Sequence, residues 1–151
     1  MLTIDASVHM NALDPGEEGS AESQAFLDQV FGRPWPVFSP TLLLVELAGT
    51  AARALDDDAR GLAVAQAVHG LPGQVWVPLD EPLAEEAGQV AARFRLRDSD
   101  AVYAAVARRN GAILVTRDRQ QLERLQGTQP VLSPAEARDW LLARGRARAA
   151  E

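Results

Sequence analysis

Four acidic residues, far apart in the sequence, are the side chains of this chain that could act together in chemistry. They are Asp5, Glu46, Asp100 and Asp118. Clustered carboxylates bind hard divalent ions such as Mg²⁺ and Mn²⁺, which prefer oxygen ligands and keep several of their waters. One or two such ions can activate a water molecule and neutralise the charge that develops on a phosphodiester. The acids therefore predict metal-assisted hydrolysis, provided that the fold brings them to one place.

Three of these acids also have an ordinary structural explanation. Asp5 could cap a helix that follows it, Asp118 could be a turn residue, and Asp100 could favour a helix dipole from the first turn. Glu46 has no such explanation, because it lies in an apolar helical stretch where burying an unpaired carboxylate costs on the order of several kcal/mol. Arg53 lies too far along the same helix to pair with it well. Glu46 therefore needs an ion-pair partner or a metal ion.

The elements that must position these acids alternate between strands and helices. Strands are expected over residues 1–4, 34–38, 74–78, 112–116 and 130–132. Helices are expected over 6–13, 20–32, 41–55, 59–69, 82–94, about 99–109, 120–125 and 134–144. This alternation predicts an α/β fold with three layers, α/β/α, and a mostly parallel central sheet. We expect a single domain over 1–144 and a frayed tail over 145–151.

Capping residues predict where several of the helices begin. Ser20, Ser39 and Ser133 are expected as N-caps, and a proline directly follows both Ser39 and Ser133. Either Asp98 or Ser99 is expected to cap the sixth helix. These signals are local, so they place helix starts without reference to the rest of the fold.

Connection rules for such a fold bring three of the acids together. Right-handed crossovers put the carboxyl ends of parallel strands on one edge of the sheet, which is where open α/β folds bind their ligands. Asp5 and Asp118 both follow predicted strands, and Asp100 lies in the first turn of a helix. Glu46 reaches the same edge only if the helix over 41–55 crosses it.

Composition limits the classes of protein to which the chain can belong. A length of 151 residues with 47% apolar residues predicts one globular domain. The absence of cysteine excludes disulfides and thiolate zinc sites. The net charge of −6 argues against a protein that coats nucleic acid, but not against a nuclease whose metal ion handles the phosphate. No apolar run approaches about 20 residues, and Asp5 comes too early for a signal peptide, so we expect a cytoplasmic protein.

The motifs around the four acids resemble those of a known family. Asp5 follows an N-terminal strand, and Glu46 lies in an apolar helix. Asp100 opens the stretch Asp-Ala-Val-Tyr-Ala-Ala-Val-Ala, and Asp118 ends the stretch Val-Thr-Arg-Asp. In their order and spacing these motifs resemble the PIN-domain ribonucleases, and most of all the small toxins of VapBC-type toxin–antitoxin pairs. The resemblance spans the chain from about residue 2 to about residue 142.

This resemblance implies a reaction, a cofactor and partners. The reaction would be hydrolysis of RNA phosphodiester bonds by an endoribonuclease that depends on Mg²⁺ or Mn²⁺. The catalytic, metal-binding quartet would be Asp5, Glu46, Asp100 and Asp118. Ser7 and Thr116 would be supporting hydroxyl residues. Toxins of this kind are typically inhibited by a cognate antitoxin and usually dimerise, so we expect an antitoxin and a homodimer.

Two positions bear on the completeness of this site. Many relatives carry an acid and a phenylalanine where this chain has Gln121 and Leu122, which weakens the expectation of a complete second metal site. Asp98 lies two residues before Asp100 and is an alternative or auxiliary ligand. The Asp-Ala-x-x-Ala-Ala spacing favours Asp100.

Other polar residues near the motifs have less specific roles. Arg97, Arg117 and Arg119 are candidate phosphate contacts, and equally candidate partners of the neighbouring acids. His9 and His69 are expected at the surface or at helix caps rather than as zinc ligands, because no partnering pattern accompanies them.

Three functions remain open from the sequence. A toxin ribonuclease is the leading interpretation, a PIN nuclease of housekeeping RNA processing without an antitoxin is the second, and a catalytically idle PIN-like binding module is the third. Retention of all four acids argues against the third. Dehalogenase-like phosphatases need an aspartate where this chain has Ser7, and receiver domains need a lysine, which this chain lacks.

Overall fold

The fold is built on a parallel sheet with its first strand in the middle. The computed structural model of the protein describes residues 1–33 and 35–149. Five strands follow the order β3-β2-β1-β4-β5, and every neighbouring pair is parallel. The strands are β1 (Leu2–Ile4), β2 (Val37–Pro40), β3 (Gln74–Val77), β4 (Ile113–Val115) and β5 (Val131–Leu132). The prediction of a mostly parallel sheet is therefore confirmed, and β5 lies at an edge as its short length suggests.

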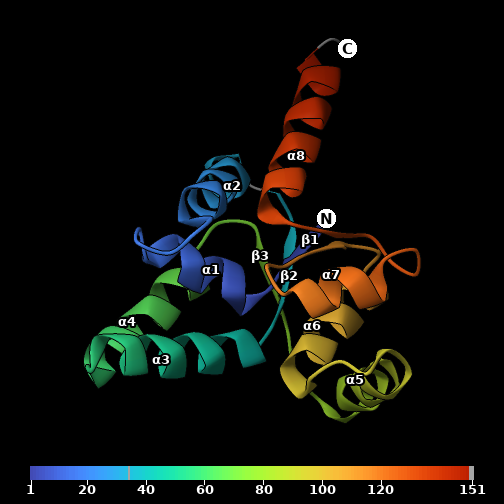
Figure 1. Cartoon of the computed structure of the whole chain (residues 1–151), viewed down its shortest axis with the longest axis horizontal. Coiled ribbons are helices and arrows are strands. Elements are labelled where there is room, and N and C mark those ends of the chain that lie inside the picture. Colours follow the sequence, from blue (N-terminus) through green and yellow to red (C-terminus); the bar gives the residue numbers. More distant parts are fainter. Residues whose placement is uncertain (34, 150–151) are drawn as a thin grey trace.

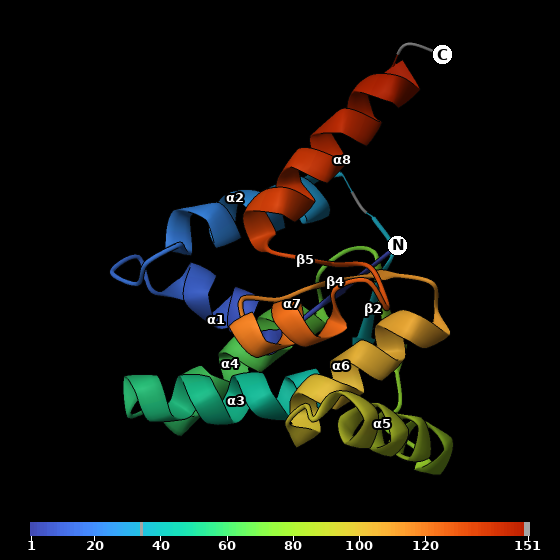
Figure 2. The same ribbon diagram turned by 45° about the vertical axis from the view of Figure 1, so that its right-hand side comes forward.

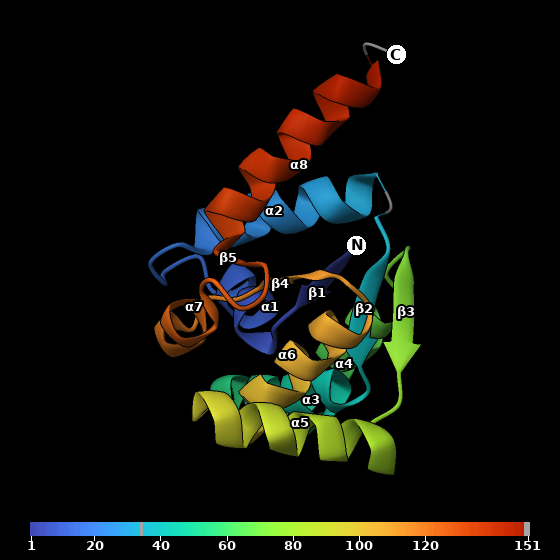
Figure 3. The ribbon, with the colours of Figure 1, turned by 90° about the vertical axis from the view of Figure 1, so that its right-hand side faces the viewer.

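Helices cover both faces of this sheet and give the three predicted layers (Figures 1 and 3). Leu2 and Ile4 of β1 point into a core cluster with α2 and α8, whereas Leu114 of β4 points into a second cluster with α3, α5 and α6. The described residues form α1 (Ala6–Leu13), α2 (Ser20–Gly32), α3 (Leu42–Leu55), α4 (Asp58–His69), α5 (Glu81–Phe94), α6 (Asp98–Arg109), α7 (Arg119–Leu125) and α8 (Pro134–Ala149).

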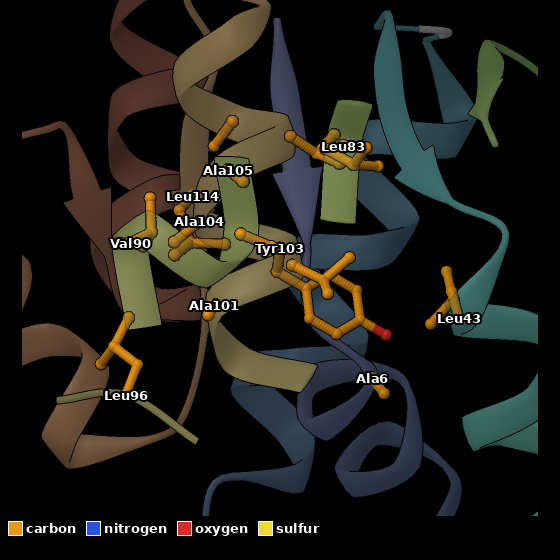
Figure 4. Close-up of a cluster of buried hydrophobic side chains, with 14 of the residues drawn as sticks. Ala6, Leu43, Leu83, Val90, Leu96, Ala101, Tyr103, Ala104, Ala105 and Leu114 are labelled. Carbon is orange, nitrogen blue, oxygen red and sulfur yellow. The ribbon is translucent and has the colours of Figure 1, made fainter. Parts of the chain in front are cut away.

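Helix α6 is the central helix of the second cluster. All of its residues from Asp100 to Ala107 are buried, and most of them are alanine or valine, which lets the helix pack closely between α5 and the sheet. Tyr103 is the one large side chain of this run and is fully buried. Figure 4 shows its ring within the cluster and its hydroxyl on the side of Leu43 and Ala6. The small residues therefore set the position of Tyr103 relative to α1 and α3.

Two predicted N-caps are wrong, one because strand pairing overrides the local signal and one because the helix begins one residue earlier. Ser39 and Pro40 belong to β2, where they pair with β3, and the Ser39 hydroxyl donates to Gln74 Oε1 at 2.8 Å. Thr41 then precedes α3. Ser20 is the first residue of α2, and the N-cap is Gly19 with a φ of 77°.

Other element boundaries also differ from the sequence predictions. Arg97, rather than Asp98 or Ser99, is the N-cap of α6, with an extended backbone and no capping hydrogen bond from its side chain. The second strand begins at Val37 rather than at Pro34, and Pro34 itself lies outside the described residues. Helix α8 continues to Ala149, so the expected end near residue 144 is wrong; residues 150 and 151 lie outside the described residues.

Several local predictions are confirmed. Helix α1 has the bounds expected for it. At the start of α8, Ser133 and Glu136 form reciprocal hydrogen bonds: Ser133 N and Oγ both donate to Glu136 Oε2 at 2.8 Å, and Glu136 N donates to Ser133 Oγ at 3.4 Å. Over residues 1–33 and 35–149, the structure contains no helix with the length and apolar character that a membrane span requires.

Candidate active site

All four predicted acids line one cavity, which we call the acid cavity. Its volume is about 290 Å³, and its lining includes Asp5, Glu46, Asp100 and Asp118. Asp5 follows β1 and caps α1, and Asp118 follows β4 and caps α7. Asp100 lies in the first turn of α6, and Glu46 comes from α3, which packs against α1 at this end of the sheet. Helix α3 therefore brings Glu46 to the same edge, as the sequence permitted but did not require. Figure 2 shows α1, α3, α6 and α7 around this end of β1 and β4.

Asp5 is the most firmly held of the acids. It is 5% exposed, and its Oδ2 accepts hydrogen bonds from Thr116 Oγ1 at 2.7 Å, from Gln121 Nε2 at 2.9 Å and from Ser7 Oγ at 3.1 Å. Thr116 Oγ1 in turn accepts from the backbone N–H of Asp118 at 3.0 Å. Both hydroxyl residues that the resemblance implied as supports therefore contact Asp5 directly.

Gln121 links Asp5 to Asp100 and is the residue at this site whose contacts the sequence did not foretell. Its side chain is fully buried, and Nε2 donates to Asp100 Oδ1 at 3.1 Å as well as to Asp5 Oδ2. Its Oε1 has no hydrogen-bond partner within the described part of the chain. Its spacing from Asp118 was the feature of the sequence that could have indicated its place. The third residue after an N-cap faces back toward the cap, and Gln121 N donates to Asp118 Oδ1 at 2.9 Å.

Burial and mutual repulsion perturb the proton affinity of Asp100. Its side chain is 11% exposed. Burial, and then the charge of Asp5, raise the pKa of Asp100 to about 6, although the guanidinium of Arg97 opposes the shift. This carboxylate is therefore short of positive charge, which is the condition that a bound cation relieves.

Glu46 has a hydrogen-bond partner that no sequence pattern indicated. The Tyr103 hydroxyl donates to Glu46 Oε2 from α6. Burial raises the pKa of Glu46, and the hydrogen bonds from Tyr103 and Ser99 oppose that shift. Burial and the nearby Glu46 charge also raise the pKa of Tyr103 well above its usual value, so the tyrosine stays a donor. Arg53 instead bonds Thr50 Oγ1 at 3.2 Å.

The three candidate arginines lie in different surroundings. Arg97 lines the acid cavity, with Nε 3.1 Å from Asp100 Oδ2 and Nη2 2.5 Å from Asp118 Oδ2. The Arg117 guanidinium instead donates to Asn11 Oδ1, away from the acids. Arg119 is largely exposed and pairs with Glu123 at 2.6 Å.

Asp98 and the two histidines lie apart from the acid cavity. Asp98 is exposed at the start of α6 and is not among the residues that line the cavity. His9 is 3% exposed and lies beside Phe31, so the expectation that it lies at the surface is wrong; burial lowers its pKa to about 4. His69 is exposed in the last turn of α4 and stacks on Trp76, with ring centroids 5.0 Å apart.

The chemistry of the donor set fits a hard divalent ion. Four carboxylates lie in the polar lining, and burial, with a smaller contribution from the charge of Asp5, raises the pKa values of Glu46 and Asp100. As the described residues stand, no three acidic, histidine or cysteine side chains are positioned to hold one ion together. Protein donors hold the acids instead: Tyr103 binds Glu46, and Arg97 bridges Asp100 and Asp118.

Comparisons with known proteins agree with this architecture. The family model of the PIN domain matches residues 2–127. The fold is similar to PAE2754 from Pyrobaculum aerophilum at 22% identity and a TM-score of 0.68, covering 94% of this chain and 95% of that chain. It is also similar to DNA-bound VapBC from Salmonella typhimurium at 20% identity and a TM-score of 0.65, covering 89% of this chain and 99% of that chain.

A third similar structure is VapC20 from Mycobacterium tuberculosis, described as a sarcin-ricin loop cleaving toxin. It is 17% identical with a TM-score of 0.62, covering 74% of this chain and 85% of that chain. No curated protein matches the chain. At these identities the structural likeness concerns the fold, whereas the family model covers most of the sequence. The chain therefore belongs to the PIN domain family.

Proposed function

We propose that this protein is an endoribonuclease that depends on Mg²⁺ or Mn²⁺ and hydrolyses RNA phosphodiester bonds. The observation that carries the proposal is the convergence of four acids, from four separate elements, on one cavity of about 290 Å³. A fold alone needs no such convergence, because each carboxylate costs free energy when it is buried near the others. A bound divalent ion would offset the free-energy cost of placing the four carboxylates close together.

In this proposal Asp5, Glu46, Asp100 and Asp118 hold the metal. When bound, the ion would activate a water and neutralise the negative charge that develops on the phosphate oxygens. The protein contributes orientation, since the hydroxyls of Ser7 and Thr116 both donate to Asp5 Oδ2. Hydrolysis would form a new P–O bond from the water oxygen, break the bond to the leaving oxygen, and leave the proton from the water on that oxygen. Arg97, at the mouth of the cavity, is the arginine best situated to contact an RNA phosphate; Arg117 and Arg119 are weaker candidates.

We further propose that the protein is the toxin of a toxin–antitoxin pair and acts in the cytoplasm as a homodimer. The support is family membership together with the similar folds, which include a toxin–antitoxin complex from Klebsiella pneumoniae. A housekeeping PIN nuclease without an antitoxin is the alternative. An antitoxin gene next to the gene for this chain would favour the first.

The two neighbouring aspartates of α6 provide a matched test of the metal site. Asp100 lines the cavity and Asp98 is exposed. The same substitution at the two positions therefore distinguishes damage to the metal site from the effect of losing one negative charge. We expect Asp100→Asn to reduce Mn²⁺-dependent cleavage of single-stranded RNA by about 100-fold or more, and Asp98→Asn to cleave like the parent. Circular dichroism controls for folding. A folded Asp100→Asn variant with parental activity, or loss of activity in Asp98→Asn alone, would contradict the assignment.

A further inference from the structure

Arg97 and Gln121 hold Asp100 from opposite sides in very different ways. Gln121 donates to Oδ1 and is fully buried, whereas Arg97 binds Oδ2 and its side chain is 70% exposed. The same guanidinium reaches Asp118 Oδ2 at 2.5 Å. One carboxylate oxygen of Asp100 is therefore held by a group that packing fixes, and the other by a group that water can replace.

The backbone around Arg97 explains how an exposed cation comes to bridge two acids. Arg97 is the N-cap residue of α6, and its extended backbone directs the side chain to the mouth of the acid cavity rather than along the helix. The carboxylates of Asp100 and Asp118 are only 11% and 18% exposed. The exposed guanidinium is therefore in contact both with solvent and with two largely buried acids.

The strength of these contacts decides whether they can be exchanged. An exposed ion pair contributes little to stability, because water and salt compete for both partners. A hard divalent ion that binds several carboxylates gains far more from the same oxygens. Arg97 can leave without loss of packing, since most of its side chain already contacts solvent.

We propose that Arg97 is an internal counter-cation of the metal-free site. Its guanidinium bridges Asp100 and Asp118 when no divalent ion is bound, gives up both carboxylates to the ion, and is then free at the cavity mouth to bind an RNA phosphate. This inference rests on the proposed function, because it concerns the same metal site. It adds an exchange in which the divalent ion replaces the Arg97 guanidinium, so that Asp100 and Asp118 have a positively charged partner both with and without the metal.

The exchange predicts effects of opposite sign on metal and RNA. Arg97→Gln removes the competing cation, so Mn²⁺ binding measured by calorimetry should tighten by about three- to tenfold. The same variant should raise the KM for single-stranded RNA at saturating Mn²⁺, because a phosphate contact is lost. A positioning role for Arg97 in the metal site would instead weaken Mn²⁺ binding.

Arg109→Gln is the control for loss of charge. Arg109 lies at the other end of the same helix, pairs with Glu86 at 2.9 Å and is not among the residues that line the acid cavity, so its neutralisation should leave Mn²⁺ affinity and the KM for RNA near the parental values. Weaker or unchanged Mn²⁺ binding in Arg97→Gln, equal tightening in both variants, or an unchanged KM in Arg97→Gln would overturn the exchange while leaving the metal site in place. Failure of the parent itself to bind Mn²⁺ would overturn the proposed function as well.

Discussion

At the scale of single residues, the donors that hold the acids differ in burial and in charge. The buried hydroxyl of Thr116 and the buried amide of Gln121 bind Asp5, a tyrosine that keeps its proton binds Glu46, and an exposed guanidinium bridges Asp100 and Asp118. The donors grow more exchangeable from Asp5 outward. The inner part of the site is therefore preorganised by packing, whereas the outer part is open to exchange with ions and substrate.

His9 gives the fold a pH dependence that is separate from the metal site. Burial lowers the pKa of His9 to about 4 from the usual 6.5, so the folded state favours the neutral ring. The stability that this provides is complete above pH 6.5 and is lost as the pH falls toward 4. By pH 5 the loss should reach about 2 kcal/mol in the free energy of unfolding.

Urea unfolding of the parent and of His9→Leu at pH 7.5 and pH 5 measures the contribution of His9 to the free energy of unfolding. Asp100 acts in the opposite direction, because its raised pKa of about 6 means that protonation below that value stabilises the fold. The comparison with His9→Leu removes that background, since both proteins keep Asp100. We expect the parent to lose more stability than the variant on acidification. Equal losses would show that His9 is not the group responsible.

At the scale of elements, contacts between segments decide what local signals leave open. Ser133 and Glu136 form their predicted helix start because all partners lie within one turn. Ser39 has the same Ser-Pro signal, but the edge of β3 is available to it and the residue becomes part of β2. A capping signal depends on neighbouring residues only, so it cannot predict that Ser39 pairs with a strand over residues 74–77.

The loop before α2 depends on a glycine for a reason that involves another element. Gly19 has a φ of 77°, and a Cβ at this position would run into the guanidinium of Arg117, which lies after β4. Gly127 has the same φ of 77° but nothing within 4 Å of the corresponding Cβ position. The two glycines therefore share the backbone strain and differ in the steric clash.

Gly19→Ala and Gly127→Ala form a matched pair for thermal or urea unfolding. Both should lose about 1 kcal/mol because alanine disfavours a positive φ. Gly19→Ala should lose more than this, by up to about 1 kcal/mol, because the Arg117 guanidinium has to move from its position at Asn11. Equal destabilisation by the two substitutions would mean that the Arg117 contact adds nothing to stability.

At the scale of the whole molecule, the topology gathers the site. Placing β1 between β2 and β4 puts the ends of β1 and β4 side by side, and α3 and α6 complete the ring of acids around them. The alternation of elements predicted this edge for Asp5, Asp100 and Asp118. The position of Glu46 and its bond to Tyr103 depend on how α3 packs against α1 and α6, which no local pattern specifies. In the sequence Gln121 stood out as a departure from a motif, although its side chain bonds two of the acids and its backbone N–H bonds a third.

Calorimetric titration of Mn²⁺ into the parent and into Glu46→Gln tests the shared metal site most directly. Glu46 is the acid that lies within a helix, beyond its first turn, rather than at a strand end or a helix start, so its participation depends on the whole fold. We expect the parent to bind Mn²⁺ and Glu46→Gln to bind it at least about tenfold more weakly, with both proteins folded. No binding by the parent, or equal binding by both proteins, would contradict a metal site formed by the four acids.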